Sequence, residues 1–277
     1  MSKLETALTD IQKALDSGDL LAAGNACSSA GQVLLGRNLY REAAHYYREA
    51  GSHFETSGEV ALQARSLNHL GICLVMEEDS PSALEILNKA LALLEQSPNN
   101  SLRTAVQGNI GLAYSALDDY KNAIKSHKSV LEAAEESGDD PLRLNALINL
   151  ADSNLQDKNY RSSQGFALVA LDLAKELDSQ PGLVITYDLL GMISSRQGNL
   201  KIAAEYHQQS FQAAQEIGDL LRQGIAMANM GLALEGLTDM EGALKAMNLA
   251  AELFTLINSD YLEKTRRDIE RVHNAMD

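Results

Sequence analysis

Small and apolar residues recur along the chain with a period of 40 residues. One position of the period is small in every unit, namely at Gly31, Gly71, Gly111, Ala151, Gly191 and Gly231. The position twelve residues later carries Ala43, Ala83, Ala123, Ser163, Ala203 and Ala243. The position seven residues after that carries Ala50, Ala90, Val130, Ala170, Ser210 and Ala250. Six units in one register, without insertions, indicate an internal repeat.

Each unit is punctuated by residues that begin or end helices. Side chains suited to N-caps precede the second apolar stretch, at Asp79, Asp119, Asn159, Asn199 and Asp239. Glycines suited to left-handed C-caps stand between units, at Gly18, Gly58, Gly138 and Gly218. The pattern therefore predicts two helices per unit, each of roughly five turns, joined by tight turns.

The recurrent glycine lies inside the first helix of its unit, where glycine costs about 1 kcal/mol relative to alanine. We expect the missing Cβ to let a neighbouring helix approach closely, and the small residue twelve positions later to lie on the second helix. Gly108 occurs in one unit only, and the repeat does not explain it.

Composition agrees with an all-α protein. Of 277 residues, 45% are apolar and only four are proline, which favours an ordered helical chain. No apolar run is long enough for a membrane span, and the N-terminal segment lacks the features of a signal peptide. Cys27 and Cys73 have neither CxxC nor metal-ligand spacing, so we expect free buried thiols and a cytoplasmic protein.

Charge and motifs exclude several functions. A net charge of −15 disfavours binding to nucleic acid or to anionic lipid. The sequence contains no P-loop, HExxH, GxSxG or Rossmann glycine motif, and its histidines do not cluster. His127 and His207 occupy one phase of the repeat, where packed side chains are expected. We expect no enzymatic activity, no cofactor and no metal.

In combination, the spaced small residues of residues 24–257 resemble the tetratricopeptide repeat (TPR). Large residues fit the start of its second helix, at Tyr40, Tyr120, Tyr160, Leu200 and Met240. The units are longer than the usual ~34 residues. The resemblance implies an all-α, right-handed superhelical solenoid of six helix-turn-helix repeats.

The expected organisation is an N-terminal capping helix, six repeats and a C-terminal capping helix. Their approximate bounds are 1–23 for the first cap, 24–63, 64–103, 104–143, 144–183, 184–223 and 224–257 for the repeats, and 258–277 for the last cap. Apolar stripes in both flanking segments fit caps, although docking of a second copy or a partner remains an alternative.

The 40-residue form resembles the adaptors of the Partner of Inscuteable family, kinesin light chains and bacterial peptide-sensing regulators. In those relatives, an asparagine two residues before the small residue commonly holds the backbone of an extended ligand, and the first helices line a concave groove. Here that position carries Ser29, His69, Asn109, Asn149, Leu189 and Asn229. The resemblance implies groove-facing side chains at Arg65, Asn68, His69, Asn109, Asn145, Asn149, Asp152, Asp188, Arg196 and Asn229, with Arg103 and Arg143 one position before that face.

These features predict a non-enzymatic scaffold or adaptor that binds an extended peptide or a helix of another protein. Amide side chains can pair with a ligand's backbone, and arginines favour carboxylate or phosphate, so an acidic or C-terminal segment is the first candidate. Two alternatives remain open: a self-associating structural protein, including a homo-oligomer, and a ligand-sensing regulator of a signalling pathway.

Overall fold

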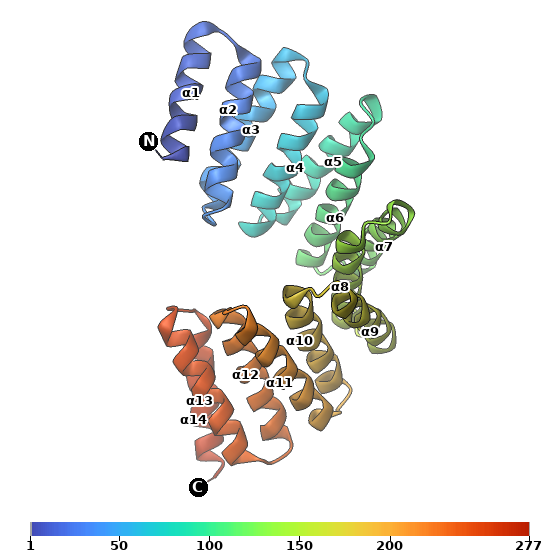
Figure 1. Ribbon diagram of the computed structural model, residues 1–277, viewed down its shortest axis with the longest axis vertical. Helices are drawn as coiled ribbons and strands as arrows, with labels where there is room; N and C mark the ends of the chain where they lie inside the picture. Colours follow the sequence, from blue (N-terminus) through green and yellow to red (C-terminus); the bar gives the residue numbers. More distant parts are fainter. Residues whose placement is uncertain (1, 277) are drawn as a thin grey trace. The chain divides into compact units, whose positions relative to one another are not determined.

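The computed structural model describes residues 2–276, which form fourteen α-helices and no strand (Figure 1). The prediction of an all-α fold of paired helices is confirmed. The bounds of the helices are α1 (Lys3–Ser17), α2 (Leu20–Leu35), α3 (Tyr40–Ser57), α4 (Val60–Met76), α5 (Ser80–Gln96), α6 (Asn100–Ala116), α7 (Tyr120–Ser137), α8 (Asp140–Gln156), α9 (Tyr160–Glu176), α10 (Gln180–Arg196), α11 (Leu200–Glu216), α12 (Leu220–Gly236), α13 (Met240–Leu256) and α14 (Tyr261–Asn274).

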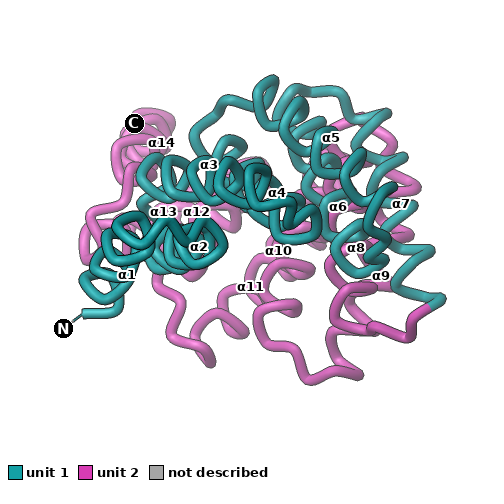
Figure 2. The backbone as a smooth tube through the Cα atoms, turned by 90° about the horizontal axis from the view of Figure 1, so that it is seen from above, with its two compact units in different colours: residues 1–136 teal, residues 137–277 magenta. Residues whose placement is uncertain are grey.

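The chain divides into two compact units, residues 1–136 and 137–277 (Figure 2). In unit 1, each helix from α1 to α6 packs against the next, and α4 also contacts α6. In unit 2, each helix from α8 to α14 packs against the next, and α10 also contacts both α8 and α12. Even-numbered helices are therefore in contact at three places, between α4 and α6, between α8 and α10, and between α10 and α12. The predicted bounds of the six repeats and the two caps remain a prediction.

Four turns have the predicted left-handed glycine. Gly18, Gly58, Gly138 and Gly218 have φ values of 71°, 77°, 68° and 69°. A side chain strains this conformation, so glycine is the residue best suited to it. In the turns within the repeats, a polar residue has the left-handed conformation in five repeats, for example Glu78 with a φ of 62°, and Gly198 has it in the sixth with a φ of 82°.

The predicted N-caps are confirmed only in part. The side chains of Asp79 and Asp239 accept hydrogen bonds from the backbone N–H groups of the first turn of α5 and α13. Asn159 and Asn199 occupy the same position before α9 and α11, but their side chains make no such bond. The prediction of a side-chain cap is therefore wrong at these two asparagines.

The recurrent glycines are buried against large side chains of the following helix, which confirms that they permit close approach. The contacts are Gly31 with Tyr47, Gly71 with Leu87, Gly111 with His127, Gly191 with His207 and Gly231 with Met247. Each partner lies sixteen positions later on the second helix of the repeat, which also carries the small residue twelve positions later. Residues equally distant from a turn are level in a helical hairpin, whereas a residue four positions nearer the turn lies about 6 Å away along the axis.

Two further residues differ from this pattern. A Cβ on Gly108 would lie 3.7 Å from Cγ2 of Val130, an ordinary contact, so packing does not require glycine there. His127 is 1% exposed and neither ring nitrogen has a hydrogen-bond partner. Burial lowers the pKa of His127 to about 4, so the ring is neutral at pH 7. His127 is a packed side chain, as predicted.

Candidate binding surface

Two asparagines at the predicted ligand-binding position tie neighbouring even-numbered helices together. Nδ2 of Asn109 on α6 donates to Oδ1 of Asn68 on α4 at 2.8 Å. Nδ2 of Asn229 on α12 donates to Oδ1 of Asp188 on α10 at 3.1 Å. Both bonds span 41 positions and are equivalent under the 40-residue period. These amides therefore position the helices as well as offering their remaining polar atoms.

Asp188, predicted to face the groove, is instead buried and accepts hydrogen bonds from two side chains. It is 6% exposed, and its Oδ1 lies 2.9 Å from Nδ1 of His207, which is itself 1% exposed. Because a carboxylate accepts, Nδ1 of His207 carries the hydrogen. Asp188 thus accepts from both His207 and Asn229, which satisfies a carboxylate in a place where an unpaired one would be costly.

Asn145 and Asn149 on α8 keep their amides unpaired. Asn145 is exposed, Asn149 is half-buried, and the part of the chain that the structure describes gives neither side chain a hydrogen-bond partner. Both amides are therefore open to a ligand.

In unit 1, the predicted residues Arg65 and His69 line a hollow of about 310 Å³ on α2 and α4. The ring of His69 stacks on that of Tyr47 with centroids 4.9 Å apart, and its Nδ1 donates to the carbonyl of Arg65 at 2.9 Å. Ser28 and Ser29 line the same hollow. The imidazole is thereby held in one orientation at the wall of this hollow.

The remaining candidates, Arg103, Arg143 and Asp152, each have a polar contact of their own. Arg103 on α6 donates to the carbonyl of Leu94 on α5 at 3.4 Å, and Arg143 pairs with Asp140 of its own helix at 3.0 Å. Asp152 accepts from Nε2 of Gln156 at 3.2 Å.

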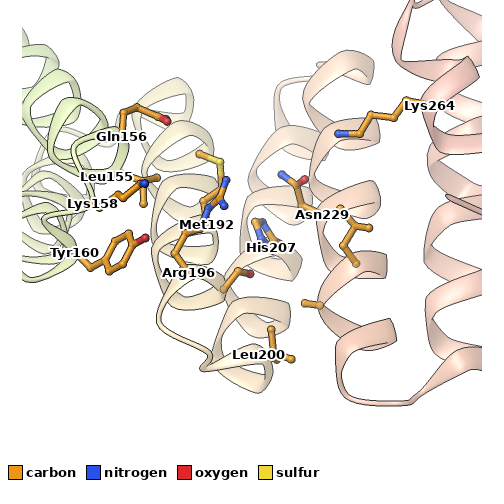
Figure 3. A pocket seen from close by; sticks show the side chains of 13 residues that line it. Leu155, Gln156, Lys158, Tyr160, Met192, Arg196, Leu200, His207, Asn229 and Lys264 are labelled. Carbon is orange, nitrogen blue, oxygen red and sulfur yellow. The ribbon is translucent and has the colours of Figure 1, made fainter. Parts of the chain in front are cut away.

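Unit 2 contains a larger hollow of about 500 Å³ between its even-numbered helices (Figure 3). The predicted residues Arg196 and Asn229 line it together with His207. Lys158 and Lys264 also line it, and sequence reasoning missed both. Lys158 lies in a turn and Lys264 in the C-terminal helix, so no shared phase of the repeat marks them.

The cysteines, the candidate metal ligands and the helix lengths bear on other possible functions. Cys27 and Cys73 are free and buried, as predicted, and burial raises the pKa of each thiol to about 11. Within residues 2–276, no three His, Cys, Asp or Glu side chains are grouped as metal ligands. No helix in this range has the length and apolar character needed to cross a membrane.

Comparison with known proteins connects this geometry to a repeat family. Residues 102–176 match the family model described as tetratricopeptide repeat. A comparison with curated protein sequences gave no match.

Solved structures share the fold at low sequence identity. The apo form of the quorum sensor NprR from B. thuringiensis is 16% identical with a TM-score of 0.71, over 98% of this chain and 79% of that one. A Rap protein complexed with Competence and Sporulation Factor is 15% identical with a TM-score of 0.67, over 92% and 76%. BtubC from P. vanneervenii is 16% identical with a TM-score of 0.65, over 80% and 90%.

The finer resemblance to Partner of Inscuteable adaptors stays a prediction. The family match and the shared fold support a coarser statement: the chain is built as a TPR-like helical solenoid, and residues 102–176 carry the tetratricopeptide repeat sequence itself.

Proposed function

We propose that this protein is a non-enzymatic scaffold that holds an extended segment of another protein along its even-numbered helices. The observation that carries the proposal is the recurrent asparagine on these helices, at Asn109, Asn149 and Asn229. The TPR-like fold supports this proposal, as does the Rap structure, in which a protein of this fold is complexed with Competence and Sporulation Factor.

The amide chemistry suits an extended backbone. An asparagine side chain has two N–H donors and an oxygen with two lone pairs. The bonds of Asn109 and Asn229 to the preceding even-numbered helix use one donor each and fix the plane of the amide. The second donor and the oxygen can then pair with a ligand's C=O and N–H, with little loss of side-chain entropy on binding.

Capture of a partner from the native cell tests the proposal. The full chain, tagged, is compared with the double variant Asn109→Ala and Asn149→Ala, and bound proteins are measured by mass spectrometry. We expect a partner that the unaltered chain retains and the variant loses by about tenfold, because each lost hydrogen bond is worth about 0.5–1.5 kcal/mol.

A matched control makes the same chemical change on odd-numbered helices. Asn88 on α5 and Asn248 on α13 are exposed, and Asn88→Ala with Asn248→Ala should leave capture unchanged. Thermal melting of every variant separates loss of binding from loss of folding. A partner retained equally by both double variants, at equal melting temperature, would remove the even-numbered helices as the binding surface.

Self-association is a second candidate, favoured by apolar side chains near the C-terminal end. Leu256 is 72% exposed and Tyr261 is 50% exposed. Light scattering over a concentration series tests this role, and a molar mass that stays at one chain would eliminate it.

The buried free thiols support the proposal of a cytoplasmic location.

A further inference from the structure

Three basic side chains surround the hollow of unit 2. Lys158 follows α8, Arg196 ends α10 and Lys264 belongs to α14, and all three are exposed. Figure 3 shows Lys264 extending from one side and Lys158 and Arg196 lying on the other. None of the three makes an ion pair among residues 2–276. Three positive charges are therefore uncompensated around one space.

The lining of this hollow contains no carboxylate, although acidic residues outnumber basic ones by 38 to 23 in the whole chain. Asp188 stands behind the lining, where its Oδ1 accepts from His207 and Asn229 and where it is 6% exposed. A cluster of one sign in a hollow focuses the electric field and attracts the opposite charge. The hollow is thus a positive site on an acidic protein.

Neutral donors complete the site. The lining includes the hydroxyl groups of Tyr160 and Ser195 and the amide of Asn229. The bond from Asn229 to Asp188 fixes that amide, and its second N–H stays available. Arginine can grip two oxygens of one anion, while lysines act as mobile point charges. Donors of this kind suit a group with several negatively charged oxygens.

We propose that this hollow binds an anionic group, a carboxylate or a phosphate ester, carried by the partner segment that the scaffold holds. The inference rests on the proposed function and names the chemistry of one anchor of that segment. Arg196 and Lys264 bind the anion directly, and Asn229 and Tyr160 orient it.

Methyl NMR on the full chain tests the anion site without knowledge of the partner. Met192 lines the hollow, so its ¹³C-labelled methyl group reports binding there, and exposed Met76 in unit 1 is the internal control. The probes are blocked glutamate, blocked phosphoserine, inorganic phosphate and, as a neutral control, blocked glutamine. We expect a saturable shift of the Met192 signal with a dissociation constant of about 1 mM for at least one anion.

The two blocked amino acids distinguish the sources, because the tighter of them identifies carboxylate or phosphate as the preferred group. The variant Arg196→Gln with Lys264→Gln should weaken binding by about tenfold or more. Arg161→Gln with Lys201→Gln removes the same charge from exposed positions of unit 2 outside the lining, and it should change affinity by less than about twofold.

Three outcomes would overturn the site: no shift at Met192 with any anion, an equal shift with blocked glutamine, or equal weakening by both charge variants. These results are separable from the fate of the scaffold. If the Met192 signal does not shift but the double variant Asn109→Ala and Asn149→Ala loses the partner, the scaffold proposal stands and the anion site is removed. If the Met192 signal shifts but that variant still captures the partner, the anion site stands and the scaffold proposal is removed.

Discussion

The side chain of Leu87 packs directly over Gly71, so closely that a Cβ on the glycine would lie 2.5 Å from Cδ2 of Leu87. Leu87 is fully buried at this contact. The same relationship recurs from repeat to repeat with Tyr47, His127, His207 and Met247 in place of Leu87. The helix-propensity cost of the glycine is thus offset by the packing of a large apolar or aromatic side chain between the two helices.

Replacing Gly71 by alanine should therefore destabilise the fold. The new methyl group overpacks a fully buried contact, which typically costs about 1–3 kcal/mol, while better helix propensity returns up to about 1 kcal/mol. Gly165 is the matched control, because it lies inside α9 and a Cβ there would meet nothing within 4 Å. Gly165→Ala should stabilise by about 0.5–1 kcal/mol. Urea denaturation measures both, and shifts of the same sign would contradict the packing role.

Stability should depend on pH through His127. Its pKa is about 4 when folded and ordinarily 6.5, so the unfolded chain takes up a proton first as the pH falls. The contribution is fully present above pH 6.5 and decreases below it, by about 3 kcal/mol near pH 4. His127→Leu should remove this part of the pH dependence, since Leu87 already packs on Gly71 in the equivalent place.

Denaturation at a series of pH values between 6.5 and 4 checks this expectation. His273→Gln is the control, because His273 is exposed and its replacement should leave the slope unchanged. An unaltered slope in His127→Leu would show that the buried ring does not carry the effect.

Asp188 should matter as an acceptor rather than as a charge. Asp188→Ala leaves Nδ1 of His207 and Nδ2 of Asn229 without their acceptor, at a cost of about 1–3 kcal/mol for the buried His207 and less for the half-buried Asn229. Asp188→Asn keeps an amide oxygen, the atom that Asn68 already offers to Asn109, so its loss should be smaller. Unfolding free energies give the comparison. Equal losses would assign the role to the negative charge.

Both thiols should be unreactive in the folded protein. Their pKa of about 11 leaves only about a thousandth of each thiol ionised at pH 8, and both side chains are fully buried. An aromatic disulfide reagent should react rapidly with two thiols per chain in denaturant and with essentially none without it. Fast reaction of the folded chain would contradict the burial of Cys27 and Cys73.

The repeat and its helices could be predicted from the sequence because each repeat obeys the same local rules. The spacing alone predicts that Gly58 ends a helix at a turn and that Gly71 lets two helices approach closely. The contact partner of Gly71 was not predicted, because it depends on which residues are level across the helical hairpin. Helix propensity and periodicity do not contain that offset.

The candidate surface was less accessible to sequence reasoning. The phase of the repeat pointed to Asn109 and Asn229, but not to the bonds that tie them to Asn68 and Asp188. Lys158 and Lys264 come from a turn and a terminal helix, so only three-dimensional packing brings them to the same hollow. Because these two lysines come from elements at different positions of the repeat, the 40-residue period does not mark them.

Site-specific photo-cross-linking measures directly whether the even-numbered helices hold a segment of another protein. A benzophenone amino acid replaces exposed Asn145 on α8 in one chain and exposed Asn248 on α13 in another, and each is irradiated in the native cell. We predict a partner adduct from position 145 and none from position 248. Adducts of equal yield at both positions, or an adduct from position 248 alone, would contradict this prediction.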